Sequence, residues 1–366
     1  MRVDKGLITG NQFMFSIICF IQSSSLLTSF LTSVTLQDSW LIVIFGAIFF
    51  IPVIFIYREI MLLFPDKNLI QILDEVYGPI LGKVFGIIYI WFFLSLTSLN
   101  VLDLGDFTKL TIMHETPSVV LMIMCVLVAS IAVRHGIGLV TKYSTFFSVT
   151  VSCLLIISVL LLLNQIKLEN FLPILSLPFK KYVQGTHLIT TIPFGELLVF
   201  LMIHPSVKLN RKQATKYLFW GFGLGTVSIL VVLCQNIAVL GNMLDMFALP
   251  TLVTLRLINL GEALSRMEVL FSVILIMLLF FKISVLYYVS VLAVSQMFNT
   301  NQLRYLSLAA GALIVCYALT LYPSPVEHAE SAKNITPFVW TPIEFLIPLL
   351  TLILGKFKKR KQLKEA

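Results

Sequence analysis

Long apolar segments separated by short polar breaks run along this sequence from end to end. An α-helix needs about 20 mostly apolar residues to cross ~30 Å of hydrocarbon, so each such segment predicts one membrane span. The sequence therefore predicts an all-α integral membrane protein, with residues 1–366 forming a single transmembrane domain. The ten predicted transmembrane helices cover roughly residues 10–32, 40–62, 84–107, 117–133, 144–163, 186–204, 215–239, 266–296, 303–322 and 338–355.

The composition excludes a water-soluble fold. Apolar residues make up 58% of the chain and charged residues 12%, and the mean hydropathy is +0.97. A soluble domain carries about a quarter of charged residues, because its surface must be wetted by water. The surface of this chain is therefore expected to face lipid.

Motifs that carry soluble chemistry are missing from the sequence. It has no nucleophile placed with a base, no metal-ligand spacing and no glycine-rich phosphate loop. The five cysteines fall inside apolar runs without a C-x-x-C pair, and we interpret them as small hydrophobic residues. We therefore expect neither an enzyme nor a cofactor.

Basic residues are distributed unevenly over the predicted loops. Loops rich in Lys and Arg are retained in the cytoplasm, so the side that carries more of them is expected to be cytoplasmic. Ten alternating spans put 18 of the 26 basic residues on the side of the N-terminus and of the basic tail 356–366. The prediction is a multi-pass protein of the bacterial cell membrane with both termini in the cytoplasm. The net charge of +8 then reflects topology and contact with anionic lipid headgroups, and no nucleic acid is expected as a partner.

Two of the predicted spans contain sequences that interrupt an α-helix. The first span has QSSS at residues 22–25, and the sixth has PFGE at residues 193–196. Proline removes a backbone donor, glycine tolerates unusual dihedral angles, and a gap within the membrane must face protein or water. Each break lies in the first helix of a set of five, which predicts two inverted repeats, roughly 10–163 and 186–355, around a central site. Alternatively, the serines bond back to carbonyls in a continuous helix, and Pro193 only kinks its span.

Charged residues inside a span are costly in hydrocarbon, so they mark cavities or partners. Glu196 lies in the break of the sixth span and Lys282 in the middle of the eighth. Asp103 and Asp106 lie toward the outer end of the third span. Glu344, near the start of the tenth span, is expected to lie close to the membrane surface.

More than one interpretation stays open for Glu196 and for Lys282. Glu196 is either a neutral cap of the broken helix or a carboxylate that couples to protons or gates the site. Lys282 either forms a structural bond, to freed carbonyls or to an acid, or replaces a coupling sodium ion by contacting the same oxygens. Ser284 and Tyr288 lie four residues apart on one helix face and are candidates to line a pocket.

Six short motifs follow one another along nearly the whole chain. They are SSSLLT at 23–28, FP at 64–65, GK at 82–83, FGE at 194–196, RME at 266–268 and FK at 281–282. In this order, on ten predicted spans, they make the chain similar to the spore-germination permease family. These proteins are the integral-membrane B subunits of bacterial germinant receptors, within the amino acid/polyamine/organocation (APC) superfamily.

The resemblance implies a LeuT-like fold of two inverted five-helix repeats with helices 1 and 6 broken. It places a germinant pocket between spans 1, 3, 6, 8 and 10. Family members usually have Gly-Ala-Gly where this chain has three serines, which alters how closely a ligand approaches the first break. The ligand-binding residues implied in this way are Ser23, Ser24, Ser25, Thr97, Val101, Phe194, Gly195, Glu196, Leu198, Ser284 and Tyr288, with Glu196 and Lys282 as coupling or structural charges.

For function, the resemblance implies a nutrient germinant receptor subunit of bacterial spores. Such a subunit binds a small germinant, often an amino acid, and triggers germination with a larger membrane A-type subunit and a lipoprotein C-type subunit. Its expected location is the spore inner membrane. The alternative is an independent amino-acid transporter, either proton-coupled or ion-independent.

Overall fold

The computed structural model describes residues 8–258, 267–298, 300 and 303–365. Arg266, the first residue of the motif RME at 266–268, lies outside the described residues. In the described part the chain consists of α-helices joined by loops and by 3-10 and π-helical turns, with no β-strand. The α-helices are α1 Gly10–Gln22, α2 Thr28–Thr35, α3 Ser39–Leu63, α4 Leu69–Thr111, α5 Ser118–Arg134, α6 Ile137–Leu161, α7 Phe179–Ile189, α8 Phe200–Ile203, α9 Arg211–Leu240, α10 Pro250–Arg256, α11 Met267–Met297, α12 Leu303–Leu321, α13 Pro325–Asn334, α14 Thr336–Thr341 and α15 Ile347–Glu365.

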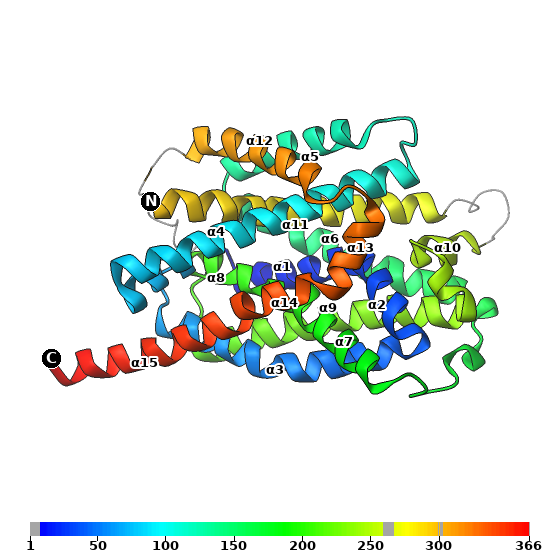
Figure 1. The fold of residues 1–366 in the computed structure, drawn as a ribbon, viewed down its shortest axis with the longest axis horizontal. Helices are drawn as coiled ribbons and strands as arrows, with labels where there is room; N and C mark the ends of the chain where they lie inside the picture. The colour runs from blue at the N-terminus through cyan, green and yellow to red at the C-terminus, as the bar shows by residue number, and fades with distance from the viewer. Residues whose placement is uncertain (1–7, 259–266, 299, 301–302, 366) are drawn as a thin grey trace.

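Most of the long helices run along the longest dimension of the molecule, as in a membrane-spanning bundle (Figure 1). The first helix, α1, lies in the interior against α6, α9 and α11. Eight of its residues are buried, including Phe13, Phe20 and Gln22. The chain therefore places its first predicted break at the centre of the bundle.

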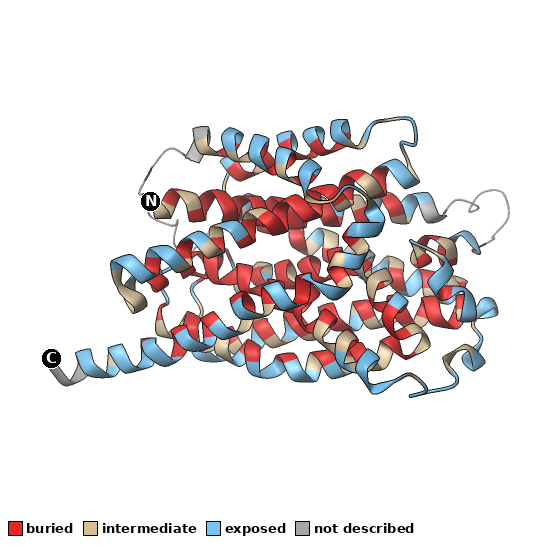
Figure 2. Cartoon of the chain, viewed as in Figure 1, coloured by how far each residue is buried: buried red, intermediate tan, exposed pale blue. Residues whose placement is uncertain are grey.

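The outer surface of the bundle is apolar. Figure 2 shows buried residues concentrated on the inward faces and exposed residues on the outward faces. Many of these exposed side chains are large and hydrophobic, which would be unfavourable in water and suits contact with lipid. Examples on the long helices are Phe49, Ile80, Phe146, Ile156 and Trp220.

Among the described residues, seven helices are long and apolar enough to cross a membrane by themselves. The number rises to eight if Leu306–Leu321 and Pro325–Asn334, bent by 90° relative to each other, form one span. The ten predicted segments are not all continuous helices. The first is divided between α1 and α2, of 13 and 8 residues, by the 3-10 turn Ser23–Leu27, and Ser118–Arg134 is a shorter apolar helix.

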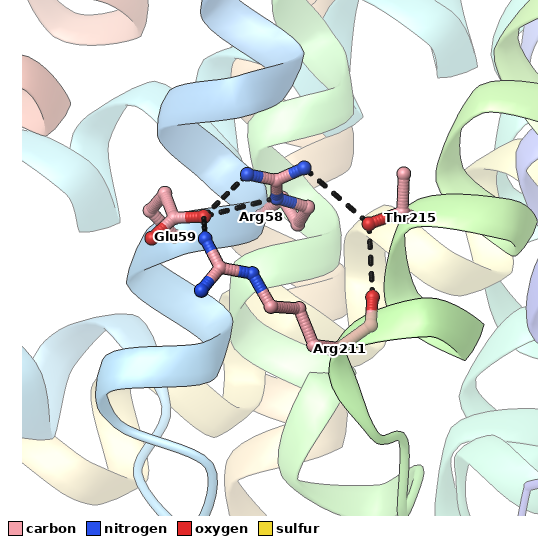
Figure 3. A network of polar contacts seen from close by, with 4 residues as sticks. All are labelled: Arg58, Glu59, Arg211 and Thr215. Atoms are coloured by element: carbon pink, nitrogen blue, oxygen red, sulfur yellow. Dashed lines mark hydrogen bonds and ion pairs between the residues drawn. The ribbon is translucent and has the colours of Figure 1, made fainter.

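A polar network joins the end of α3 to the start of α9 (Figure 3). The Glu59 carboxylate accepts from the Arg58 guanidinium on its own helix and from Arg211 Nη2 at 3.0 Å. Arg58 also donates to Thr215 Oγ1 at 3.4 Å. One carboxylate therefore pairs with two guanidinium groups, and these two helix ends lie at the same end of the bundle.

The beginning of the described chain and its last helix reach this same end. The Ile8 N–H donates to the Ser206 carbonyl at 3.3 Å, a few residues before α9 begins. Lys359 on α15 donates to the Leu63 carbonyl, at the end of α3. A chain that begins and ends on one side of a bilayer crosses it an even number of times, so this arrangement fits an even number of spans.

Candidate functional site

The first predicted break is present between α1 and α2. Residues Ser23–Leu27 form a 3-10 turn, so the continuous α-helix considered above is not what the chain adopts. Serine hydroxyls do bond back to the main chain, because Ser23 Oγ donates to the Phe20 carbonyl at 2.6 Å. After the turn, Thr28 Oγ1 donates to the Ser25 carbonyl at 2.5 Å. The hydroxyl-rich sequence thus supplies additional donors to main-chain carbonyls around the turn.

The second predicted break, between α7 and α8, departs further from α-helical geometry. Residues Thr190–Phe194 form a π-helical turn in which Ile192 has an extended backbone, with φ −116° and ψ 110°. A 3-10 turn follows at Gly195–Val199. Pro193 provides no N–H to continue an α-helix through this stretch. The segment is more than a kink, and both turns are buried throughout.

A buried ion pair joins this second break to α11. Lys282 Nζ lies 2.6 Å from Glu196 Oε2, and the side chains are 0% and 1% exposed. Lys282 Nζ also donates to Ser24 Oγ at 2.7 Å, and it lies 4.9 Å from the centre of the Phe20 ring. Of the alternatives for Lys282, pairing with an acid is the one that the structure contains. The pair connects both broken spans to α11.

The other predicted site residues are buried, but most of their polar groups are used within the helices. Ser284 Oγ donates to the Phe280 carbonyl at 2.8 Å. Thr97 Oγ1 donates to the Phe93 carbonyl and lies 3.1 Å from Ser290 Oγ on α11, so it faces Ser290. The remaining buried members of the predicted set are Ser25, Val101, Phe194, Gly195, Leu198 and Tyr288.

The space at the two breaks is small. One cavity is lined by residues that include Ser24, Thr28 and Pro193, and it has a volume of about 10 Å³. Another, lined by residues that include Gln22 and Ser25, is also about 10 Å³. Such a volume is close to the minimum that holds one water molecule, whereas ligand pockets measure roughly 300–1,000 Å³. At these positions the predicted pocket is closed.

A much larger cavity of about 780 Å³ opens between α3 and α7. Its lining is mainly apolar and includes Phe45 and Phe49 on α3 and Phe179 on α7. It reaches Thr190, the first residue of the π-helical turn Thr190–Phe194, and Thr341, which directly precedes the turn Pro342–Leu346. None of the predicted ligand-binding residues is among those that line it.

Glu344 is an acidic residue whose burial the sequence did not predict. It is 0% exposed, in the π-helical turn Pro342–Leu346 between α14 and α15. Its carboxyl group lies against Gly195, where an added Cβ would overlap it. Tyr57 Oη donates to the main-chain carbonyl of Glu344 at 2.8 Å and lies 3.3 Å from the main-chain carbonyl of Gly195. The available signal was Pro342, since a proline shortly before an acid also marks the break at Glu196.

Comparison with protein families and relatives gives a consistent result. The profile of a family described as spore germination protein matches residues 7–325. The chain is 26% identical over 365 residues to spore germination protein KB of Bacillus subtilis (strain 168), an alignment that covers 98% of this chain and 97% of that protein. It is 25% identical over 339 residues to spore germination protein YndE of the same organism, with 88% of each covered.

Solved transporters share the fold. MHP1, a nucleobase-cation-symport-1 family transporter in a closed conformation with bromovinylhydantoin bound, aligns with a TM-score of 0.66 at 11% identity, covering 97% of this chain and 91% of that chain. A manganese transporter of Eremococcus coleocola aligns with a TM-score of 0.57 at 13% identity, covering 95% and 84%. At such low identities the similarity concerns the fold alone.

Proposed function

Because the chain belongs to the spore germination protein family, we propose that it is a nutrient germinant receptor subunit of bacterial spores. It binds a small germinant, such as an amino acid, in a mid-membrane pocket. It triggers germination together with a larger membrane A-type subunit and a lipoprotein C-type subunit. Its location is the spore inner membrane, with both termini in the cytoplasm. The relatives, all spore germination proteins by name, support this role.

The proposed architecture has ten spans in two inverted repeats. The similarity to MHP1 supports it, as do the two chain ends at one end of the bundle and the irregular turns in the first and sixth predicted spans. In such folds, broken helices expose backbone groups to a solute bound between the repeats. The proposed pocket therefore lies where the two breaks approach each other.

The observation that carries the pocket assignment is the ion pair between Lys282 and Glu196, with Ser24 beside it. An amino acid carries a carboxylate that Lys282 is able to bind and an ammonium that Glu196 is able to bind. Charge-assisted hydrogen bonds of this kind are among the strongest in proteins. A zwitterionic germinant would replace the ion pair between Lys282 and Glu196 by two ion pairs, one with each residue. Its entry would separate α11 from the two breaks.

The alternative function is independent amino-acid transport, which the fold shared with transporters favours. In that case the Lys282 ammonium, held by Ser24 and Glu196, would stand in for a coupling cation. Reconstitution separates the two functions. The receptor proposal expects the purified chain in liposomes to show no saturable uptake of labelled amino acids, and saturable uptake would favour the transporter.

Spores that carry this receptor alone provide the direct test. Each of the common amino acids is tested as a germinant, and dose curves are compared for the wild type, Glu196→Gln and Lys282→Met at matched protein levels. We expect both variants to lose the response, because each removes one of the two charges that recognise a zwitterion. Copurification from the same spores should recover two partner subunits. A wild-type response unchanged in both variants would refute the pocket assignment.

A further inference from the structure

Glu344 is a buried acid in the π-helical turn between α14 and α15. Its side chain is fully shielded, and within the described part of the chain neither carboxyl oxygen has a hydrogen-bond partner. Buried polar groups are nearly always hydrogen-bonded, and a buried charge is nearly always paired. An acid that breaks both rules at the centre of a membrane protein calls for a functional explanation.

Among the described residues that pack around Glu344, none supplies a positive charge to it. On α3 and α4, Tyr57 and Tyr89 donate their hydroxyl protons to main-chain carbonyls of the turn, Tyr89 Oη to Ile343 at 2.9 Å. On the sixth predicted span, Glu196 is an acid, and it is the partner of Lys282. The adjoining helices α14 and the first turns of α15 add no charge, because no other charged residue occurs between Lys333 and Lys356.

The packing leaves no space for a bulky cation at the contact with Gly195. A single Cβ added to that glycine would already overlap the Glu344 carboxyl group. The hydroxyls of Tyr57 and Tyr89 donate to main-chain carbonyls of the turn and so hold its backbone in place. A proton requires no volume, and it removes the cost of several kcal/mol that an uncompensated buried carboxylate carries.

We propose that Glu344 is a proton-binding site, and that release of its proton accompanies opening of the pocket. With the proton bound, the neutral carboxylic acid packs against Gly195 and the two turns stay together. Without it, a carboxylate is buried against the Gly195 backbone near Glu196, so the turns separate until the oxygen is solvated by water. The proton passes from the carboxyl O–H to that water. The link to the pocket depends on the function proposed above, because Gly195 lies in the break that the germinant is proposed to approach.

The sign of the effect follows from this linkage. If the open, germinant-binding state has lost the proton, germinant binding releases one proton, so rising pH favours binding. In the pH range where germinant binding releases the Glu344 proton, the affinity for the germinant should rise by up to about tenfold per pH unit. Glu344→Gln, which is neutral at all pH values, should remove this dependence.

Infrared difference spectroscopy of the purified chain in nanodiscs tests the proton site without any germinant. At neutral pH we expect the C=O band of a protonated carboxylic acid in the wild type, absent from Glu344→Gln. Glu59→Gln is the matched control and should keep the band, because Glu59 is ionised between two arginines. Should Glu344→Gln fail to fold, Glu344→Asp retains a carboxyl group and should give a displaced band.

Two results would overturn the proposal in distinguishable ways. A band of the same intensity in Glu344→Gln and in the wild type would show that Glu344 is not a protonated acid, whatever the function of the protein. A band that disappears, together with wild-type germinant binding that does not change with pH, would refute the link between the proton and opening. Loss of the band together with a pH dependence that Glu344→Gln removes would support both parts.

Discussion

Lys282 Nζ lies 2.6 Å from Glu196 Oε2, and neither side chain is more than 1% exposed. The two residues come from different predicted spans, and Ser24 from a third contributes its hydroxyl to the same ammonium. This contact holds α11 against both irregular turns. Forming such a pair gains little over an apolar pair of the same shape, but breaking it leaves a buried charge. The pair therefore specifies which spans meet at the centre.

Lys282→Met tests this role. The substitution leaves Glu196 as an uncompensated buried acid, and we expect it to destabilise the folded protein by about 3–5 kcal/mol. The double variant Lys282→Met with Glu196→Gln should recover a large part of the loss, because no charge remains. Unfolding of the purified chains in detergent measures both. Equal stability of Lys282→Met and the wild type would show that the pair does not hold the bundle together.

Tyr57 provides a second test, because its hydroxyl lies within hydrogen-bond distance of main-chain carbonyls in two turns, those of Glu344 and Gly195. Tyr57→Phe keeps the ring and removes the O–H, which leaves buried carbonyls without a donor at a cost of about 1–3 kcal/mol. Tyr143→Phe is the matched control, since Tyr143 is 52% exposed. Thermal unfolding should show a lower midpoint for Tyr57→Phe only. A similar fall in both variants would point to a general effect of losing a tyrosine hydroxyl.

The sequence predicts those features of the site that depend on neighbouring residues, and not those that depend on contacts between distant segments. The breaks at 22–25 and 193–196 are local, so proline and clustered hydroxyls were enough to place them. The charge on Lys282 was evident, but its partner was left open because pairing across spans depends on how the helices pack. The apolar segments predicted helices correctly. Hydropathy alone, however, does not show that a turn divides the first span into α1 and α2.

Glu344 and the pocket show where prediction fails. The position of Glu344 near the start of a predicted span suggested an ordinary place near the membrane surface, but its burial depends on the helices that cover it, here α3 and α4. The resemblance to the family implied a set of pocket residues, and the structure buries them at a centre with cavities of about 10 Å³. Free volume depends on the packing of side chains from distant segments, which no local pattern contains.

Gly195 gives a prediction about close packing. Its φ of −61° is accessible to any residue, so a substitution there meets no backbone strain, and the obstacle is the Glu344 carboxyl group. We expect Gly195→Ala to impair germinant response and Gly195→Leu to abolish it, while the protein still reaches the membrane. Gly223→Ala is the matched control, because an added Cβ there meets nothing within 4 Å.

Dose curves for germination, at matched protein levels, measure this effect. Ser284→Ala should do less than Gly195→Ala, because its hydroxyl is bonded within its own helix to the Phe280 carbonyl. Loss of one neutral hydroxyl commonly costs about 0.5–1.5 kcal/mol, a shift of roughly two- to twelvefold in germinant concentration. If Gly195→Leu left every dose curve unmoved, the pocket would not lie at this turn.

The last prediction concerns the orientation of the chain in the membrane. Lys180 lies at the start of α7 and Lys212 at the start of α9, and the apolar helical stretch Phe179–Ser206 runs between these two ends. They should therefore lie on opposite sides of the bilayer, with Lys212 in the cytoplasm if the excess of basic residues sets the orientation.

Single cysteines at either position are treated with a membrane-impermeant maleimide, in intact protoplasts and after lysis. We expect Lys180→Cys to react in intact protoplasts and Lys212→Cys only after lysis, with the parent chain correcting for reaction at the native cysteines. Reaction of Lys212→Cys alone in intact protoplasts would invert the orientation, and reaction of both would contradict a membrane span between them.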